Sequence, residues 1–204
     1  LGRERKLILP RTYSYLLQQA DVENRDQAIK QIKSTLGRAI DKIYDPLEGG
    51  FFRYAEKRNW QIPHYEKFAD LNAGAVLLLY QINQVSPSPE LKQVADLTLD
   101  YLTSTLFDVE TGCFLSFQIA DTRYYSLNRK QRDLAREPKV MNKIFTDRLA
   151  MTLSYLIQID EIIEDQALQD QIRQSLDFLL VMIKHEGGLK RYYSVADNQW
   201  LVQS

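Results

Sequence analysis

Apolar residues recur at intervals of three and four along much of the chain. The clearest example lies between residues 26 and 44, where charged residues separate the aliphatic positions Ile29, Ile32, Leu36, Ile40 and Ile43. This spacing places the apolar side chains on one face of a helix. Asp26 is a suitable N-terminal cap, and Pro46 ends the helix because proline cannot continue its hydrogen-bond ladder.

The same one-faced pattern predicts further helices over residues 90–107 and 166–184. Two other stretches, 66–84 and 146–163, are apolar on nearly every side, which is typical of helices surrounded by protein. One-faced and all-round helices therefore alternate along the chain. We predict an all-α fold of two layers, with the all-round helices inside and the one-faced helices outside. An α-solenoid is the alternative arrangement of two such layers.

Two segments have weaker patterns. Residues 13–20, which follow Pro10, favour two helical turns. Residues 129–136 favour a short helix within the irregular part of the chain at 113–145. This part is rich in Lys and Arg, but acidic residues dilute its charge, so we interpret it as a solvated linker rather than a nucleic-acid site.

The loops between the predicted helices repeat. Residues 49–54 (GGFFRY) have a counterpart at 187–192 (GGLKRY), residues 60–62 (WQI) at 200–202 (WLV), and residues 68–73 (FADLNA) at 145–150 (FTDRLA). Each unit is therefore an outer helix, a loop with glycine and aromatic residues, and an inner helix opened by Phe-x-Asp. Repeated units carry their equivalent loops on one face, where a ligand site would collect.

The first of these loops contains an imidazole and two carboxylates, from His64, Glu66 and Asp70. In an extended segment His64 and Glu66 face the same way; in a helix that starts near Tyr65, Glu66 and Asp70 stack at i, i+4. We identify these three residues as catalytic acid–base candidates for sugar isomerisation or glycoside hydrolysis. In the structural alternative, the acids stabilise the helix N-terminus and His64 bonds a neighbouring backbone group.

Arginine and aromatic residues in both loops are candidates for binding a substrate. The arginine fork binds carboxylate or phosphate, and aromatic faces stack on sugar rings. In the alternative interpretation, the aromatic residues close the ends of the helical assembly. The predicted substrate-binding residues are Arg53, Tyr54, Trp60, Asn72, Arg191, Tyr192 and Trp200.

Composition narrows the classes of function. The net charge of -1 provides no field for nucleic acid or an acidic membrane, and no apolar run is long enough to span a bilayer. The single cysteine, Cys113, excludes an internal disulfide framework and is compatible with a reducing compartment, so we expect a cytoplasmic protein. With no second histidine near His64, we expect no metal site. We expect no cofactor either.

The motif in the first loop resembles a known family. Its parts are Gly49–Tyr54, Trp60, Pro63–Lys67 and Asn72-Ala73. In this order they resemble the spermatogenesis-associated, thioredoxin-domain-containing proteins, most strongly over residues 40–120. The resemblance implies an α/α toroid similar to N-acylglucosamine 2-epimerases and six-hairpin glycosidases.

The chain also departs from this family. The acid at Asp70 lies one place earlier than the family's, Ala120–Arg123 replaces an acidic loop, and Thr146–Arg148 replaces Trp-Asn-Gly. No Cys-x-x-Cys is present, so the thioredoxin-like domain is absent from this chain. We treat residues 1–204 as a single toroid domain or a fragment of one.

Two functions follow from the resemblance and the loop residues. The first is a carbohydrate-related enzyme of isomerase, epimerase or glycosidase type, acting on a small sugar-like ligand. The alternative is a binding or scaffolding module that retains the toroid without the chemistry. Three hairpins fall short of a six-hairpin ring, so we expect either a homodimer or the remainder of a longer chain to complete it. We expect no nucleic-acid and no membrane partner.

Overall fold

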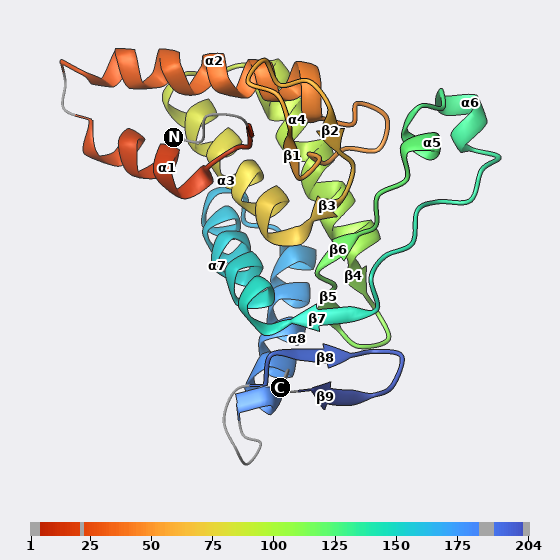
Figure 1. The fold of residues 1–204 in the computed structure, drawn as a ribbon. Helices are drawn as coiled ribbons and strands as arrows, with labels where there is room; N and C mark the ends of the chain where they lie inside the picture. The colour runs from red at the N-terminus through yellow and green to blue at the C-terminus, as the bar shows by residue number, and fades with distance from the viewer. Residues whose placement is uncertain (1–4, 21–22, 184–189, 202–204) are drawn as a thin grey trace.

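A computed structural model of the chain describes residues 5–20, 23–183 and 190–201. Its long helices form three hairpins (Figure 1). The first pairs α1 (Pro10–Gln19) with α2 (Arg25–Ile43), and the second pairs α3 (Ala69–Val85) with α4 (Pro89–Tyr101). The third pairs α7 (Thr146–Ile163) with α8 (Gln166–Ile183). A π-helical turn, Leu102–Leu106, extends α4.

The first helix of each hairpin belongs to an inner row and the second to an outer layer. Helix α3 lies at the centre of this row, packed on α1 on one side and on α7 on the other. Every residue from Asn72 to Tyr80 is buried, whereas α2 buries only one face. The predicted two-layer, all-α toroid is therefore confirmed, with three hairpins side by side.

Helix α1 supplies a third inner helix that the sequence pattern predicted only weakly. It begins at Pro10 rather than at residue 13, because proline suits the first turn, where its missing N–H has no partner to lose. Helix α7 is less enclosed than its composition predicts: Ala150, Ser154 and Ile157 are exposed. It is the last helix of the inner row in the described chain, so one of its sides has no inner neighbour.

Short strands, absent from our prediction, connect the hairpins. Strand β1 (Tyr54–Ala55) pairs with β2 (Pro63–His64), and β4 (Phe107–Asp108) with β5 (Cys113–Phe114). The others join the two ends of one hairpin: β3 (Lys67–Phe68), before α3, pairs with β6 (Phe117–Gln118), and β7 (Lys143–Phe145), before α7, pairs with β8 (Tyr192–Ser194). Strand β8 also pairs with β9 (Gln199–Leu201). All these pairings are antiparallel, and none builds a layer of its own.

The predicted sequence repeat is only partly a structural one. Phe68 and Phe145 each end a strand and precede the first residue of an inner helix, as the Phe-x-Asp repeat predicts. Trp60 lies in a turn with φ 66°, whereas Trp200 belongs to β9, so these two positions are not equivalent. Gly187 and Gly188 lie outside the described residues.

Two further helices are short. Helix α5 (Thr122–Tyr125) and helix α6 (Arg129–Arg132) project from the side of the hairpins, within the segment that we interpreted as a linker (Figure 1). Asn128 and Gln131 form a capping box at the start of α6. The predicted helix at 129–136 therefore exists but ends earlier.

The turn at Gly49 provides a test of the packing. Its φ is +76°, and an added Cβ would lie 2.3 Å from the Leu97 carbonyl oxygen. We expect Gly49→Ala to lower the free energy of unfolding by more than about 2 kcal/mol. Gly37→Ala is the matched control, because nothing lies within 4 Å of its Cβ in α2. This control should stabilise by about 0.5–1 kcal/mol. Urea unfolding measures both, and equal effects would contradict this packing.

Candidate functional site

The loop from Gly49 to Lys67 reaches the N-terminal end of α3 and is fastened there by Asn72. The Phe51 N–H donates to Asn72 Oδ1 at 2.5 Å, and Asn72 Nδ2 donates to the carbonyls of Phe51 (3.1 Å) and Phe68 (2.8 Å). Asn72 is fully buried. Its amide is therefore used by the fold, and we do not carry Asn72 into the proposed ligand site.

A buried ion cluster closes the base of the same loop. Lys67 and Asp45 are 0% and 1% exposed, and Lys67 Nζ donates to Asp45 Oδ2 at 2.8 Å and to the Gly49 carbonyl at 2.7 Å. The ammonium also lies over the rings of Tyr101 (4.6 Å) and Tyr125 (4.8 Å). Both ends of the loop are thus held at one point.

Arg132 extends this cluster to helix α6. Its Nη1 donates to Asp45 Oδ2 at 2.7 Å and lies 3.1 Å from Glu48 Oε2. Burial acts to raise the pKa of Asp45, but the charges and hydrogen bonds of Lys67 and Arg132 outweigh it and hold that pKa below its usual value. The cluster therefore favours the ionised carboxylate. Sequence reasoning missed it because its members are far apart along the chain.

Four predicted site residues meet at the rim formed by β1 and β2. Antiparallel pairing places Tyr54 opposite His64, and their rings stack at 4.2 Å. His64 Nδ1 lies 3.9 Å from Glu66 Oε2, and Arg53 Nη1 lies 3.7 Å from Glu66 Oε1. The structure therefore brings Arg53, Tyr54, His64 and Glu66 together.

A fifth rim residue, Glu56, was not predicted. Its Oε1 lies 2.7 Å from His64 Nε2, and this hydrogen bond lowers the pKa of the Glu56 carboxyl. The pairing of β1 with β2 brings the two side chains close, and a two-residue strand gives too short a pattern to predict that pairing. His64 thus lies between two carboxylates.

Asp70 is separated from this rim. Of the two alternatives for this segment, the helical one is wrong: the helix predicted over 66–84 begins at Ala69, and Glu66 lies between β2 and β3. Strand pairing of residues 67–68 with β6 replaces the first predicted helical turn. Glu66 and Asp70 therefore do not form an i, i+4 pair on a helix.

Asp70 instead pairs with Arg148 of helix α7. Arg148 Nη1 donates to both carboxylate oxygens, at 2.9 and 3.0 Å. Burial raises the pKa of Asp70 above its usual value, and Arg148 opposes that shift without cancelling it. The guanidinium carbons of Arg148 and Arg53 lie 4.3 and 5.0 Å from the centre of the Phe68 ring. Phe68 thus connects the rim to the Asp70–Arg148 pair.

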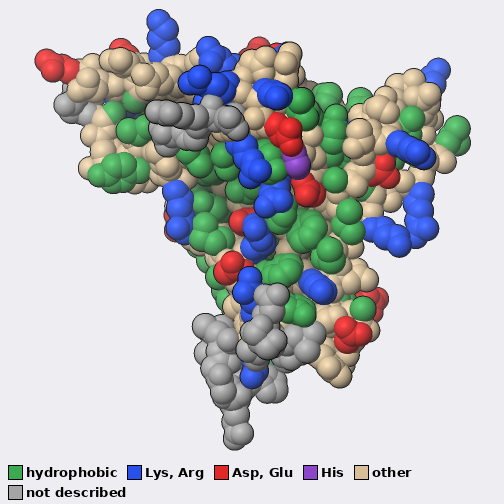
Figure 2. All heavy atoms as spheres, in the orientation of Figure 1, with side chains coloured by type: hydrophobic (Ala, Val, Ile, Leu, Met, Phe, Trp, Pro, Cys, Tyr) green, Lys and Arg blue, Asp and Glu red, His purple; other side chains and the backbone are tan. Residues whose placement is uncertain are grey.

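A cavity of about 710 Å³ opens beside this pair, between the N-terminal ends of α3 and α7. Figure 2 shows basic and acidic side chains alternating down the middle of one face of the molecule. The walls of the cavity combine aromatic rings with cations. The main lining residues are Phe68, Phe117, Phe145, Arg148, Lys190 and Arg191. The volume and the lining suit a small polar ligand.

The remaining predicted binding residues take different places. Trp60 is buried in the hydrophobic core, so we leave it out of the proposed site. Arg191 is exposed and lines the cavity, and Tyr192 packs its ring against Phe145 at 5.5 Å. The side chain of Trp200 lies outside the described part of the structure.

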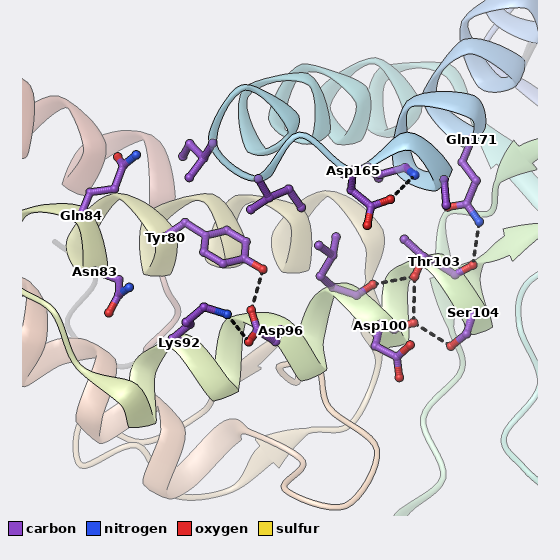
Figure 3. A pocket seen from close by; sticks show the side chains of 15 residues that line it. Tyr80, Asn83, Gln84, Lys92, Asp96, Asp100, Thr103, Ser104, Asp165 and Gln171 are labelled. Carbon is purple, nitrogen blue, oxygen red and sulfur yellow. Dashed lines mark hydrogen bonds and ion pairs between the residues drawn. The ribbon is translucent and has the colours of Figure 1, made fainter.

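A second cavity, of about 610 Å³, lies on the outer side between α4 and α8 (Figure 3). Its polar groups bond to one another: Asp96 accepts from Tyr80 at 2.9 Å and from Lys92 at 2.6 Å. Gln171 donates to the Thr103 carbonyl at 3.1 Å. This cavity lies near the C-terminal end of α3 rather than at the loops, so we do not assign the site to it.

Two other kinds of site find no support in the described part of the chain. No group of three or more His, Cys, Asp and Glu side chains there is placed to hold a metal ion. None of its helices is both long enough and apolar enough to cross a membrane.

Comparison with known proteins supports the resemblance found in the sequence. No known family profile matches the chain. Over 117 residues it is 32% identical to spermatogenesis-associated protein 20 of Mus musculus, and equally to that of Rattus norvegicus. The match covers 57% of this chain but 15% of either relative, so the chain spans a small part of their length.

Several solved structures with the same fold are named as sugar epimerases, isomerases or glycosidases. A cellobiose 2-epimerase from Spirochaeta thermophila has a TM-score of 0.74 at 16% identity, over 97% of this chain and 48% of its own. A D-mannose isomerase has a TM-score of 0.67 at 10% identity, and the match covers 98% of this chain and 47% of the isomerase. A family 76 mannosidase from Bacteroides thetaiotaomicron has a TM-score of 0.58 at 12% identity, and the match covers 82% of this chain and 40% of the mannosidase. The chain thus has the fold of the α/α toroids and spans about half the length of these neighbours or less.

The Asp45 cluster leads to a prediction on stability and pH. Asp45→Asn leaves two buried cations short of a counter-charge and should lower the free energy of unfolding at pH 7 by about 3–5 kcal/mol. The folded-state pKa of Asp45 is depressed, so its contribution is present above the unfolded pKa near 4 and lost as pH falls. The difference between variant and wild type should therefore shrink below about pH 4.

Urea unfolding across this pH range measures the effect. Asp41→Asn is the control, because Asp41 pairs with Lys42 at the surface and should contribute about 0–1 kcal/mol. If Asp45→Asn lowers the free energy of unfolding no more than Asp41→Asn does, the cluster does not hold the loop.

Proposed function

We propose that this half-toroid contributes a carbohydrate-binding site at the N-terminal ends of α3 and α7. The observation that carries the proposal is the 710 Å³ cavity, where three phenylalanine rings lie beside Arg148 and Arg191. Aromatic faces pack on the apolar faces of sugars, and charged or polar groups orient the hydroxyls. The sugar-processing activities named for the structural neighbours support the same class of ligand.

At the rim beside this cavity, which Phe68 connects to it, His64 and Glu66 are the acid–base candidates. Glu66 Oε2 is buried and accepts no hydrogen bond from a described residue, and His64 Nδ1 lies 3.9 Å away. An imidazole beside a free carboxylate oxygen suits proton transfer at a sugar carbon. The pair therefore favours isomerase or epimerase chemistry over glycoside hydrolysis. Hydrolysis requires two carboxylates at the bond, whereas Asp70 is held by Arg148 and Glu56 bonds His64.

A second candidate function is sugar binding without chemistry. Two contacts favour it: both oxygens of Asp70 accept from Arg148, and His64 Nε2 bonds Glu56. Each contact occupies a group that a catalytic cycle would use. The two functions share a ligand and differ in turnover, so one set of variants tests both.

We expect a sugar to raise the melting temperature of the wild type, because a ligand that binds only the folded state stabilises it. His64→Ala and Glu66→Gln should each weaken binding by roughly tenfold. Both should keep the free energy of unfolding within about 0.5 kcal/mol, since the two side chains are partly exposed. Thermal shift, calorimetry and urea unfolding measure these effects, with Glu110→Gln in an exposed turn as the control.

Exchange of the sugar C2 proton in D₂O, followed by NMR, separates the two functions. Proton exchange in the wild type that is lost in Glu66→Gln supports isomerase or epimerase chemistry. Sugar binding without proton exchange supports the binding function. If both variants instead lose about 1–3 kcal/mol of stability and no sugar binds, these residues serve the fold alone.

We further propose that the rest of the ring comes from a second copy or from the remainder of a longer chain. Large apolar side chains are exposed at both ends of the row of hairpins. They are Tyr15 (62%) and Leu16 (43%) on α1, and Leu180 (50%) and Val181 (54%) on α8. Such surfaces are typical of places where another part of a protein packs.

The isolated chain should accordingly associate in solution. Light scattering should give a mass above that of a monomer, and Leu16→Asp combined with Leu180→Asp should reduce it. Leu134→Asp is the control, because Leu134 is 92% exposed just after α6, which projects from the side of the hairpins. A wild-type monomer that binds little hydrophobic dye argues against this assembly.

A further inference from the structure

We infer that the ligand of the inner-helix cavity is an anionic sugar, whose carboxylate or phosphate binds among Arg148, Lys190 and Arg191. This inference rests on the proposed carbohydrate site and specifies its ligand. The first observation is the charge of the lining. Three cations line the cavity, and one carboxylate, from Asp147, lines it with them. A neutral sugar would use none of this excess positive charge.

The main chain holds two of these cations at the cavity. The Thr146 N–H donates to the Arg191 carbonyl at 3.0 Å, and Thr146 Oγ1 donates to the Lys190 carbonyl at 2.6 Å. These bonds fasten residues 190–191 to the start of α7. Neither Lys190 nor Arg191 forms an ion pair with a described residue. Among the described residues, nothing competes with a ligand for their charges.

The third cation, Arg148, is only partly engaged by hydrogen bonds within the protein. Arg148 contacts Asp70 through Nη1 alone, and its Nη2 makes no hydrogen bond to a described residue. Asp70 fixes the guanidinium beside Phe68 and leaves the other edge of the fork unpaired. An arginine fork is a suitable partner for a carboxylate or phosphate.

The aromatic walls specify that the anion is attached to a sugar. Phe68 and Phe117 stack at 4.6 Å, and Phe145 lines the same cavity. A free inorganic anion gains nothing from these rings, whereas a sugar ring packs on them. The recognised chemistry is therefore a polyhydroxylated ring that bears a negative group.

Calorimetry with glucose, glucuronate, glucose 6-phosphate and inorganic phosphate tests this inference. We expect at least one of the two anionic sugars to bind roughly tenfold more tightly than glucose, because charge-assisted hydrogen bonds are the stronger ones. Binding of glucuronate identifies the anion as a carboxylate, and binding of glucose 6-phosphate identifies it as a phosphate. Its affinity should fall with added salt, because the cations are partly exposed, while the affinity for glucose should not.

Lys190→Met combined with Arg191→Met should weaken binding of the anionic sugar more than binding of glucose, and so remove the preference for the anionic sugar. Arg173→Met is the matched control, since it deletes one exposed cation on α8 that pairs with Asp170. Urea unfolding of each variant verifies folding.

The outcomes separate this inference from the proposed function. Equal binding of glucose and both anionic sugars overturns the inference and leaves the carbohydrate site in place. Inorganic phosphate that binds as tightly as glucose 6-phosphate also overturns it, because the sugar then contributes nothing. If none of the four compounds binds, the carbohydrate site itself is refuted.

Discussion

One carboxylate oxygen, Oδ2 of Asp45, holds two cations from distant parts of the chain inside the protein. Lys67 lies 22 residues away along the chain and Arg132 lies 87 residues away. A buried ammonium or guanidinium without a counter-charge is costly, so these segments are stable in place only together. Lys67 also bonds the Gly49 carbonyl and closes the base of the loop that carries Arg53, Tyr54, His64 and Glu66. The geometry of the rim therefore depends on an interaction that no rim residue makes.

The helical layers were predictable because their signal is local. Each long helix shows its apolar positions within a window of about 18 residues, and the all-round pattern of α3 corresponds to its burial. Helix α1 gave a weak signal because, of its ten residues, only Pro10 and Leu17 are buried. The strands contain two or three residues each, too few to show an alternating pattern.

The site was predictable only where its residues are neighbours in sequence. His64 and Glu66 are two positions apart and do approach each other. Arg148, the partner of Asp70, lies 78 residues away, so nothing near Asp70 in sequence indicated the ion pair. Lys67 belongs to the motif that carries the resemblance, yet its burial depends on Asp45, 22 residues away, whose carboxylate also accepts from the more distant Arg132. Asn72 looked like a ligand contact because an amide side chain bonds sugars and backbone alike.

The pairing of β3 with β6 and of β7 with β8 has a consequence for how such proteins diversify. Each pair joins the strand before a hairpin to the strand after it, and β6 also bonds residues 139–141, which lead to α7. All these links are main-chain hydrogen bonds, which form whatever side chains the strands carry. The spacing of the inner-helix ends therefore does not depend on which side chains line the cavity. Neighbours that share 10–16% of their residues with this chain retain the same scaffold. In a toroid linked by main-chain hydrogen bonds, charged or aromatic residues at the loop end can be replaced without a change in the arrangement of the helices.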